Sequence, residues 1–301
     1  MKISRVAIIG LGLIGGSVGL SVREMLPDVA TTGWDADADV RARAAERGLA
    51  GTVCDTVAEA VREADLVILC VPVGAMGYAA EAIAPHIRPG TIVSDVGSSK
   101  RSVGEALAAA LPEAVVIPAH PVAGTENSGP EAGFATLFRH RWCIVTPRDD
   151  TPPDALAALT EFWEGLGATV EIMDPRHHDL VLAVTSHIPH LIAYTIVGTA
   201  SDLEEVTRGE VIKYSAGGFR DFTRIAASNP TMWRDVFLSN RDAVLEVLGR
   251  FTEDLSLLQR AIRNGDGDTL YDLFDRTRTI RRSIIEQGQD DARPDFGRKD
   301  H

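Results

Sequence analysis

Cysteine is scarce in this sequence of 301 residues, occurring only as Cys54, Cys70 and Cys143. Their odd number, wide spacing and apolar neighbours argue against a disulfide framework and against a cysteine-based metal site. We therefore expect three reduced residues in the core of a protein from a reducing compartment.

Apolar runs long enough to span a bilayer are also missing, since none approaches the required length of about 18–20 residues. Met1-Lys2 leads directly into a short apolar run and a glycine turn. This start does not resemble the long hydrophobic core of a secretory signal. These features predict a cytoplasmic protein without a membrane partner.

Positive charge is in deficit. The chain has 30 Lys and Arg against 43 Asp and Glu, a net charge of −13 and a pI of about 5.1. This balance excludes a general binder of nucleic acid or of anionic membranes. An anionic small molecule would have to bind through a few local arginines. The hydrophobic share of 45% and charged share of 24% are those of a soluble globular protein.

Residues 1–173 have the pattern of an α/β domain. Short apolar runs alternate with helical patterns such as residues 39–47 and 101–111. This alternation is typical of a Rossmann-type, doubly wound parallel sheet. The candidate strands are residues 6–9, 31–34, 66–71, 92–95, 115–117, 143–146 and 169–172.

The character of the chain changes near Asp174-Pro175. Residues 174–288 carry helical periodicity and no strand-like run, which predicts an all-helical domain. Its apolar helices offer more surface than one chain covers, so we expect a homodimer through this domain. The polar tail, residues 289–301, is predicted to be disordered. The long helical patterns are residues 176–199, 234–264 and 269–285.

A glycine-rich turn follows the first predicted strand. The turn has the pattern G-x-G-x-x-G and precedes a helix. Its glycines are Gly10, Gly12 and Gly15, and Leu13 and Ile14 lie between the last two. Gly10 suits a tight turn, Gly12 close approach of a pyrophosphate, and Gly15 close helix–strand packing. The free N–H groups at the start of the helix attract phosphate. This context predicts a dinucleotide cofactor.

The next strand favours NAD over NADP. Asp35 ends that strand, about 20 residues after the glycine turn. A carboxylate at this place bonds the ribose hydroxyls of NAD and repels the ribose phosphate of NADP. Arg41 and Arg43 are interpreted as a solvated helix face. Val71 and Pro72 close another buried strand and are expected to contact the cofactor through their backbone.

His120 follows the apolar run 115–117. Open α/β sheets place their chemistry at the carboxyl ends of strands. Histidine is poised to accept a proton near neutral pH, so His120 is a candidate general base. A structural histidine with satisfied hydrogen bonds is the alternative.

Two further groups of polar residues are candidates for the same crevice. The loop Asp95-Val96-Gly97-Ser98-Ser99-Lys100 follows the next strand, and its small residues would let a substrate and the cofactor approach each other. The alternative is that the loop only caps the following helix. Ser186 and His190 share one helix face, whereas His187 lies on another. The His-x-x-His spacing would suit zinc, but Pro189 interrupts the helix and no third ligand is evident. No metal is expected.

Arg224 ends the segment Gly217-Gly218-Phe219-Arg220-Asp221-Phe222-Thr223-Arg224 between two predicted helices. A guanidinium binds a planar carboxylate through two parallel hydrogen bonds. The alternative is an intramolecular ion pair with Asp221 or Glu126.

Five motifs in order, GLGLIGGS, DVGSSK, HPVAGTENSG, SHIPH and GGFRDFTRIAASNPTMWRD, resemble the prephenate/arogenate dehydrogenase family of tyrosine biosynthesis. The resemblance implies an NAD-dependent oxidoreductase of aromatic amino acid biosynthesis that converts prephenate to 4-hydroxyphenylpyruvate by oxidative decarboxylation. Arogenate, oxidised to tyrosine, is the alternative substrate. No carboxylate is evident beside Ser186 and His190 to receive its ammonium group, which favours prephenate.

The resemblance also implies residue roles. His120 takes the proton of the ring hydroxyl, and Ser98 supports that hydroxyl, with Ser99 as the alternative in register. Arg224 holds the ring carboxylate. The remaining matches are Ser186 and His190 at the side-chain end of the substrate, and Thr125, Glu126 and Asp221 in a polar network at the pocket mouth.

Two other functions remain as alternatives. A β-hydroxyacid dehydrogenase of similar build usually recruits a lysine from the helical domain, where Lys213 is the only lysine. A non-catalytic NAD-sensing protein would not need a base, a serine and an arginine in one pocket. The dehydrogenase of prephenate is the preferred hypothesis.

Overall fold

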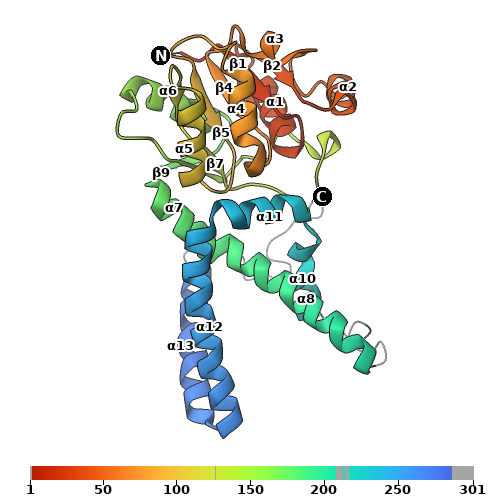
Figure 1. The fold of residues 1–301 in the computed structure, drawn as a ribbon, viewed down its shortest axis with the longest axis vertical. Coiled ribbons are helices and arrows are strands. Elements are labelled where there is room, and N and C mark those ends of the chain that lie inside the picture. Colours follow the sequence, from red (N-terminus) through yellow and green to blue (C-terminus); the bar gives the residue numbers. More distant parts are fainter. Residues whose placement is uncertain (1, 126, 208–212, 214–216, 287–301) are drawn as a thin grey trace. The chain divides into compact units, whose positions relative to one another are not determined.

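The computed structural model describes residues 2–125, 127–207, 213 and 217–286 of the chain (Figure 1). Its contacts form two compact units, Met1–Leu245 and Glu246–His301. The boundary expected near residue 173 falls inside the first unit, where strands give way to helices, and stays a prediction. The tail expected to be disordered lies outside the described residues.

Six parallel strands form the main sheet of the first unit. Their order, β3-β2-β1-β4-β5-β6, is that of doubly wound dinucleotide-binding folds and confirms the predicted Rossmann-type class. The strands are β1 (Arg5–Ile9), β2 (Ala30–Trp34), β3 (Thr52–Val53), β4 (Leu66–Leu69), β5 (Ile92–Asp95) and β6 (Val115–Val116).

Helices cover both faces of this sheet because side chains alternate along each strand. Val6 and Ile8 of β1 pack into one core cluster, and Ala7 and Ile9 pack into the other. Figure 1 shows α4 and α5 side by side over one face. The first cluster includes side chains from α1 (Leu13–Met25), α2 (Ala38–Arg47) and α6 (Pro153–Gly165), and the second from α3 (Val57–Val61), α4 (Met76–Ile83) and α5 (Arg101–Ala110).

A second, three-stranded sheet corrects one expectation about His120. β7 (Ala119–Pro121) pairs antiparallel with β8 (Trp142–Val145), which pairs parallel with β9 (Thr169–Ile172). His120 therefore lies within its own strand, opposite Ile144, and not directly after a strand of the main sheet. Pro118 separates β6 from β7 because it has no N–H for the sheet ladder. The predicted strands 143–146 and 169–172 belong to this smaller sheet.

Helices follow β9, as expected. A continuous run consists of α7 (Pro175–Leu182), the π-helical turn η3 (Ala183–His187) and α8 (Ile188–Thr207). After α10 (Gly217–Thr223) and the short η4 (Arg224–Ala227), α11 (Pro230–Ser239) packs closely on η1 (Val73–Ala75). α12 (Arg241–Asn264) continues into the second unit, where α13 (Gly267–Glu286) follows it.

The run Pro175–Leu203 is long and apolar enough to cross a membrane by length and composition, with a mean hydropathy of 1.6 in an 18-residue window. The expectation that no segment reaches spanning length was therefore too strong. His178 and Asp179 at the start of this run are nevertheless buried and hydrogen-bonded within the protein. Ile196 and Val197 further along are exposed. We interpret the run as a helix of a folded protein with part of its apolar surface uncovered.

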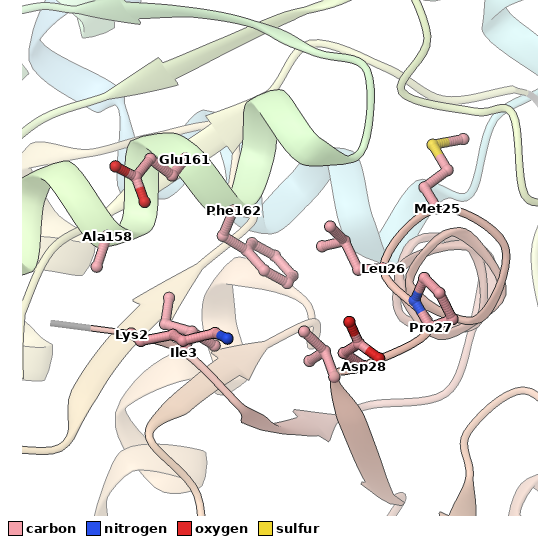
Figure 2. A pocket seen from close by; sticks show the side chains of 10 residues that line it. Lys2, Ile3, Met25, Leu26, Pro27, Asp28, Ala158, Glu161 and Phe162 are labelled. Atoms are coloured by element: carbon pink, nitrogen blue, oxygen red, sulfur yellow. The ribbon is translucent and has the colours of Figure 1, made fainter.

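A cavity of about 550 Å³ lies at the amino ends of β1 and β2. Figure 2 shows Phe162 of α6 and Leu26, at the end of α1, pointing towards it, with Lys2 and Glu161 nearby. Ligands of open α/β sheets bind outside the carboxyl ends of the strands, which is the opposite edge. The cavity is therefore not the predicted site.

Replacing Gly19 by alanine should destabilise the fold. A Cβ at Gly19 of α1 would fall 1.7 Å from the carbonyl oxygen of Leu49, so backbone must move against backbone. We expect a loss of more than about 2 kcal/mol in the free energy of unfolding, measured by urea denaturation. Gly77→Ala is the matched control, since a Cβ there meets no atom within 4 Å. Equal effects of both substitutions would contradict this packing.

Candidate active site

The glycine turn after β1 has the backbone that its sequence predicts. Gly10 has a φ of +98°, and a Cβ there would fall 2.5 Å from the carbonyl oxygen of Cys70. A Cβ on Gly15 would fall 1.9 Å from the carbonyl oxygen of Gly10. Both positions therefore require glycine, which lets the loop after β1 lie against the end of β4.

The start of α1 fits a dinucleotide. Gly12 precedes the helix, no side chain caps its N-terminus, and its first turn contains no acidic residue. A Cβ on Gly12 would meet no atom within 4 Å, so space is open beside these N–H groups. Free amide donors, the positive end of the helix dipole and open space together suit a phosphate group.

Asp35 lies next to this turn, as predicted. Its carboxylate accepts hydrogen bonds from the backbone N–H groups of Leu11, at 2.8 Å, and Asp37, at 3.0 Å. Arg41 donates to the carbonyl oxygen of Asp35, and Arg43 forms an ion pair with Glu131. Arg43 is exposed, as expected of a solvated helix face, whereas Arg41 is half-buried. Asp35 thus lies beside the glycine turn, and its role towards a ribose stays a prediction.

The loops after β4 and β5 complete this edge of the sheet. Val71 and Pro72 follow β4, and Val96 donates a backbone hydrogen bond to the carbonyl oxygen of Leu69. A Cβ on Gly97 would fall 3.3 Å from a methyl group of Val73. The predicted cofactor and substrate loops therefore lie against each other.

A buried ion pair ties the β5 loop to His120. Lys100 Nζ donates to Asp95 Oδ2 at 2.5 Å and to the carbonyl oxygen of Ala119 at 2.6 Å, and both charged side chains are fully buried. The backbone N–H groups of Gly97 and Ala119 also donate to Asp95. Burial is the main influence on both groups, raising the pKa of Asp95 and lowering that of Lys100. The pair fixes the backbone immediately before His120.

His120 is buried and contacts a second histidine. Its Nδ1 lies 2.9 Å from Nε2 of His178, a fully buried residue of α7. The rings meet edge to face, with centroids 5.2 Å apart. Among the described residues, no hydrogen bond engages Nε2 of His120. This nitrogen is the one that can serve a substrate.

The two candidate serines differ in their surroundings. The Ser99 side chain is buried, and its Oγ lies 2.7 Å from Oγ of Ser239. Ser98 is half-buried. The partner of Ser99 favours Ser98 as the serine available to a substrate, and this assignment stays a prediction.

His190 is held by a π turn in its helix. Pro189 cannot donate to the helix ladder, and just before it the N–H of Ile188 bonds the carbonyl oxygen of Ala183, five residues back. His190 Nδ1 donates to the carbonyl oxygen of Ser186 at 2.8 Å. The His190 ring stacks on Trp233 of α11, with centroids 3.7 Å apart. In neutral His190, Nε2 is therefore the acceptor nitrogen.

Arg224 lies at the start of η4 and is exposed. Its positive charge contributes to the lowered pKa of His190, after the larger effect of burial, so the two predicted substrate groups are electrostatic neighbours. Asp221 and Thr125 are exposed, and Thr125 Oγ1 accepts a local hydrogen bond from the N–H of Asn127. Glu126 lies outside the described residues. No contact described here joins Thr125 or Asp221 to the other predicted substrate groups.

The sequence reasoning missed several buried partners of these residues. His178 and Asp179 lie one helix turn after Asp174, and Asn240 donates to the Asp179 carbonyl oxygen at 2.8 Å and contacts His187 Nδ1 at 3.1 Å. The only sequence signal was two adjacent histidines and an acid at the start of an otherwise apolar helix. Neither periodicity nor spacing indicates that residues 58 positions apart meet.

Burial keeps the histidines of this site neutral. It lowers the pKa of His120 well below the ordinary value of 6.5, and the charges of His178, Lys100 and His187 lower it further. Burial also lowers the pKa of His178, and it lowers that of His187 to about 4. At neutral pH each ring therefore has one protonated and one unprotonated nitrogen.

Stability should consequently fall in mild acid. The unfolded chain protonates its histidines near pH 6.5, whereas folded His187 does so near pH 4. Between these values the unfolded state binds more protons, and the difference corresponds to about 3 kcal/mol at most for this residue. We expect urea unfolding to show a decline in stability from pH 6.5 to pH 4 and a smaller decline in His187→Phe. An unchanged slope in this variant, relative to the exposed-site control His86→Gln, would contradict the assignment.

Two family models match the chain in succession. The prephenate dehydrogenase nucleotide-binding domain matches residues 18–172, and the prephenate dehydrogenase dimerization domain matches residues 174–276. Among curated proteins, a cyclohexadienyl dehydrogenase from Zymomonas mobilis is 46% identical over 279 residues, covering 93% of this chain and 95% of the relative. A prephenate dehydrogenase from Bacillus subtilis is 32% identical, covering 92% and 75%.

Solved structures agree. The structure of prephenate dehydrogenase from Aquifex aeolicus with hydroxyphenyl propionate and NAD+ has a TM-score of 0.88 and 30% identity, covering 94% of this chain and 99% of that one. Synechocystis arogenate dehydrogenase has a TM-score of 0.79 and 26% identity, covering 93% and 99%. Sequence, fold and site geometry lead to one conclusion: this chain belongs to the prephenate dehydrogenase family.

Proposed function

We propose that this chain is an NAD-dependent prephenate dehydrogenase of tyrosine biosynthesis, an oxidoreductase. The observation that carries the proposal is the position of His120. It is a buried, neutral imidazole with one nitrogen available, joined through Lys100 to the loop beside the glycine turn. A dehydrogenase acting on an alcohol needs a proton acceptor at this place.

Gly10, Gly12 and Gly15 with Asp35 would hold the dinucleotide, and Val71 and Pro72 would contact it through their backbone. When bound, NAD accepts a hydride. His120 would take the proton of the ring hydroxyl while the C–H bond of the hydroxyl-bearing carbon gives up that hydride. The ring carboxylate leaves as carbon dioxide, and its electron pair completes the aromatic ring. The phenolate oxygen then takes back the proton from His120, which regenerates the base.

The binding groups divide between the two ends of the substrate. Arg224 would hold the ring carboxylate, which departs uncharged, so it has to position this group without stabilising it more than the transition state. Ser98 would support the hydroxyl beside His120. Ser186 and His190 would lie at the side-chain end, with Thr125, Glu126 and Asp221 at the mouth.

The surroundings of His190 favour prephenate over arogenate. The charged group that affects the pKa of His190 is the cation Arg224, and no acidic residue among those described contributes to that shift. An ammonium group on the substrate side chain would meet like charge there, whereas a keto group and its carboxylate would not.

We also propose a cytoplasmic homodimer with an NAD-binding domain up to residue 173 and a helical domain from residue 174. Exposed apolar side chains on α8 support the dimer, among them Ile196, Val197 and Leu203. Sedimentation equilibrium should give twice the chain mass of 32.3 kDa, and Val197→Glu should shift the mass towards one chain. A single-chain mass for the unaltered protein would contradict the dimer.

The decisive experiment measures NADH formation with NAD and prephenate, beside NAD and arogenate. We expect rapid turnover of prephenate and a fall of about 100-fold or more in kcat for His120→Asn, with NAD affinity retained, because only the base is lost. His86→Asn, at an exposed position remote from the site, is the control. Binding of NAD without turnover of either substrate would overturn the proposed function and leave the fold assignment intact.

A further inference from the structure

A chain of hydrogen bonds runs from a carboxylate to the available nitrogen of His120. Asp179 Oδ1 lies 2.9 Å from His178 Nδ1, and His178 Nε2 lies 2.9 Å from His120 Nδ1. All three side chains are buried. A hydrogen bond between two nitrogens needs one proton, so the direction of each bond determines where the proton of each ring sits.

The direction is set at Asp179. Its carboxylate accepts the backbone N–H of Lys100 at 2.7 Å and that of Arg101 at 3.0 Å. These groups begin α5, so a side chain from α7 caps a helix of the nucleotide-binding region, where the helix dipole favours negative charge. With main-chain donors on both oxygens, the Asp179 side chain acts as a hydrogen-bond acceptor. His178 must therefore donate from Nδ1.

The next bond follows from the first. Burial lowers the pKa of His178, so its ring is neutral and carries one proton, which is already on Nδ1. Its Nε2 can only accept, and Nδ1 of His120 must donate to it. The remaining nitrogen of His120, Nε2, then has a free lone pair. In water the opposite tautomer of neutral histidine, protonated on Nε2, is the more common one.

We propose that Asp179 and His178 are positioning residues that hold His120 in the Nδ1-protonated tautomer and so leave Nε2 as the proton acceptor for the substrate hydroxyl. This inference rests on the proposed function for the identity of the proton donor. The tautomer itself does not depend on the substrate.

The same hydrogen bonds also persist when Nε2 of His120 receives a proton during turnover. When His120 takes the substrate proton, its Nδ1–H keeps its acceptor on His178, and His178 keeps its acceptor on Asp179. No bond in the chain has to break or turn. Asn240 steadies the same segment, because its Nδ2 donates to the carbonyl oxygen of Asp179. The base therefore stays aimed while its charge changes.

The first test is the tautomer of His120 in the full-length protein. Two-bond ¹H–¹⁵N spectra of histidine-labelled protein at pH 7.5 distinguish Nδ1–H from Nε2–H rings. We expect Nδ1–H for both His120 and His178. In Asp179→Asn either orientation of the amide sets its NH₂ group against a backbone N–H of Lys100 or Arg101, so the direction of the bond to His178 is no longer fixed. We expect a population of His120 with its proton on Nε2 in this variant. An Nε2–H tautomer of His120 in the unaltered protein would overturn the proposal, whether or not prephenate is a substrate.

The second test separates positioning from folding. In Asp179→Asn we expect kcat with prephenate to fall about 10–100-fold, no further than in His120→Asn, with little change in KM or NAD affinity, because part of the enzyme then holds His120 in the wrong tautomer. His178→Gln keeps an acceptor for His120 and should retain at least tenfold more activity than His178→Phe. Equal kcat values for these two variants would count against the relay.

Thr146→Val provides the matched control. Thr146 is buried beside β7, and its hydroxyl bonds the carbonyl oxygen of Pro118 without touching His120. We expect this variant to lose some thermal stability but to keep the tautomer and kcat. A loss of kcat in Thr146→Val as large as in Asp179→Asn would mean that general destabilisation explains the effect. Expected tautomers without turnover of prephenate would overturn the proposed function alone.

Discussion

The site depends on one buried charge, the ammonium of Lys100. Taking an amine and a carboxylate fully out of water costs several kcal/mol for each ion, and only close pairing with further hydrogen bonds offsets this cost. Asp95 supplies the opposite charge, and the carbonyl oxygen of Ala119 supplies the second acceptor. Because these partners belong to β5 and β7, the pair joins the main sheet to the small sheet. His120, the next residue after Ala119, is placed by this connection.

The polar network therefore crosses the division between sheet and helices. Lys100 begins α5 and Asp179 belongs to α7, yet the backbone N–H of Lys100 donates to the Asp179 carboxylate. Asn240, between α11 and α12, bonds the same segment of α7. A shift of α7 that broke these bonds without admitting water would leave buried polar groups unpaired, which is costly. The network thus couples the position of the base to the packing of the helices that carry His190 and Arg224.

The parts of the fold that follow from local rules were predictable. The glycine turn, Asp35 and seven apolar runs could be placed because turn geometry and alternation are properties of short segments. β7 was missed because three residues next to a proline carry no strand period, and its register depends on β8, more than 20 residues away. His178 and Asp179 were missed for a related reason. Their role arises from contacts across 58 and 79 positions, and one sequence without relatives has no signal for such pairs.

The buried histidines show how stability and chemistry are opposed here. His187 is buried with its Nε2 lacking a hydrogen bond among the described residues, and its lowered pKa makes the fold sensitive to acid. His120 bears the same cost of burial, but burial also keeps it unprotonated at neutral pH, as a base must be. An exposed histidine would avoid the loss of stability, but it would exchange tautomers freely and be partly protonated near pH 6.5. A buried ring with one fixed partner has a single orientation and a single proton position. The network therefore lowers the stability of the fold but fixes the position of the base.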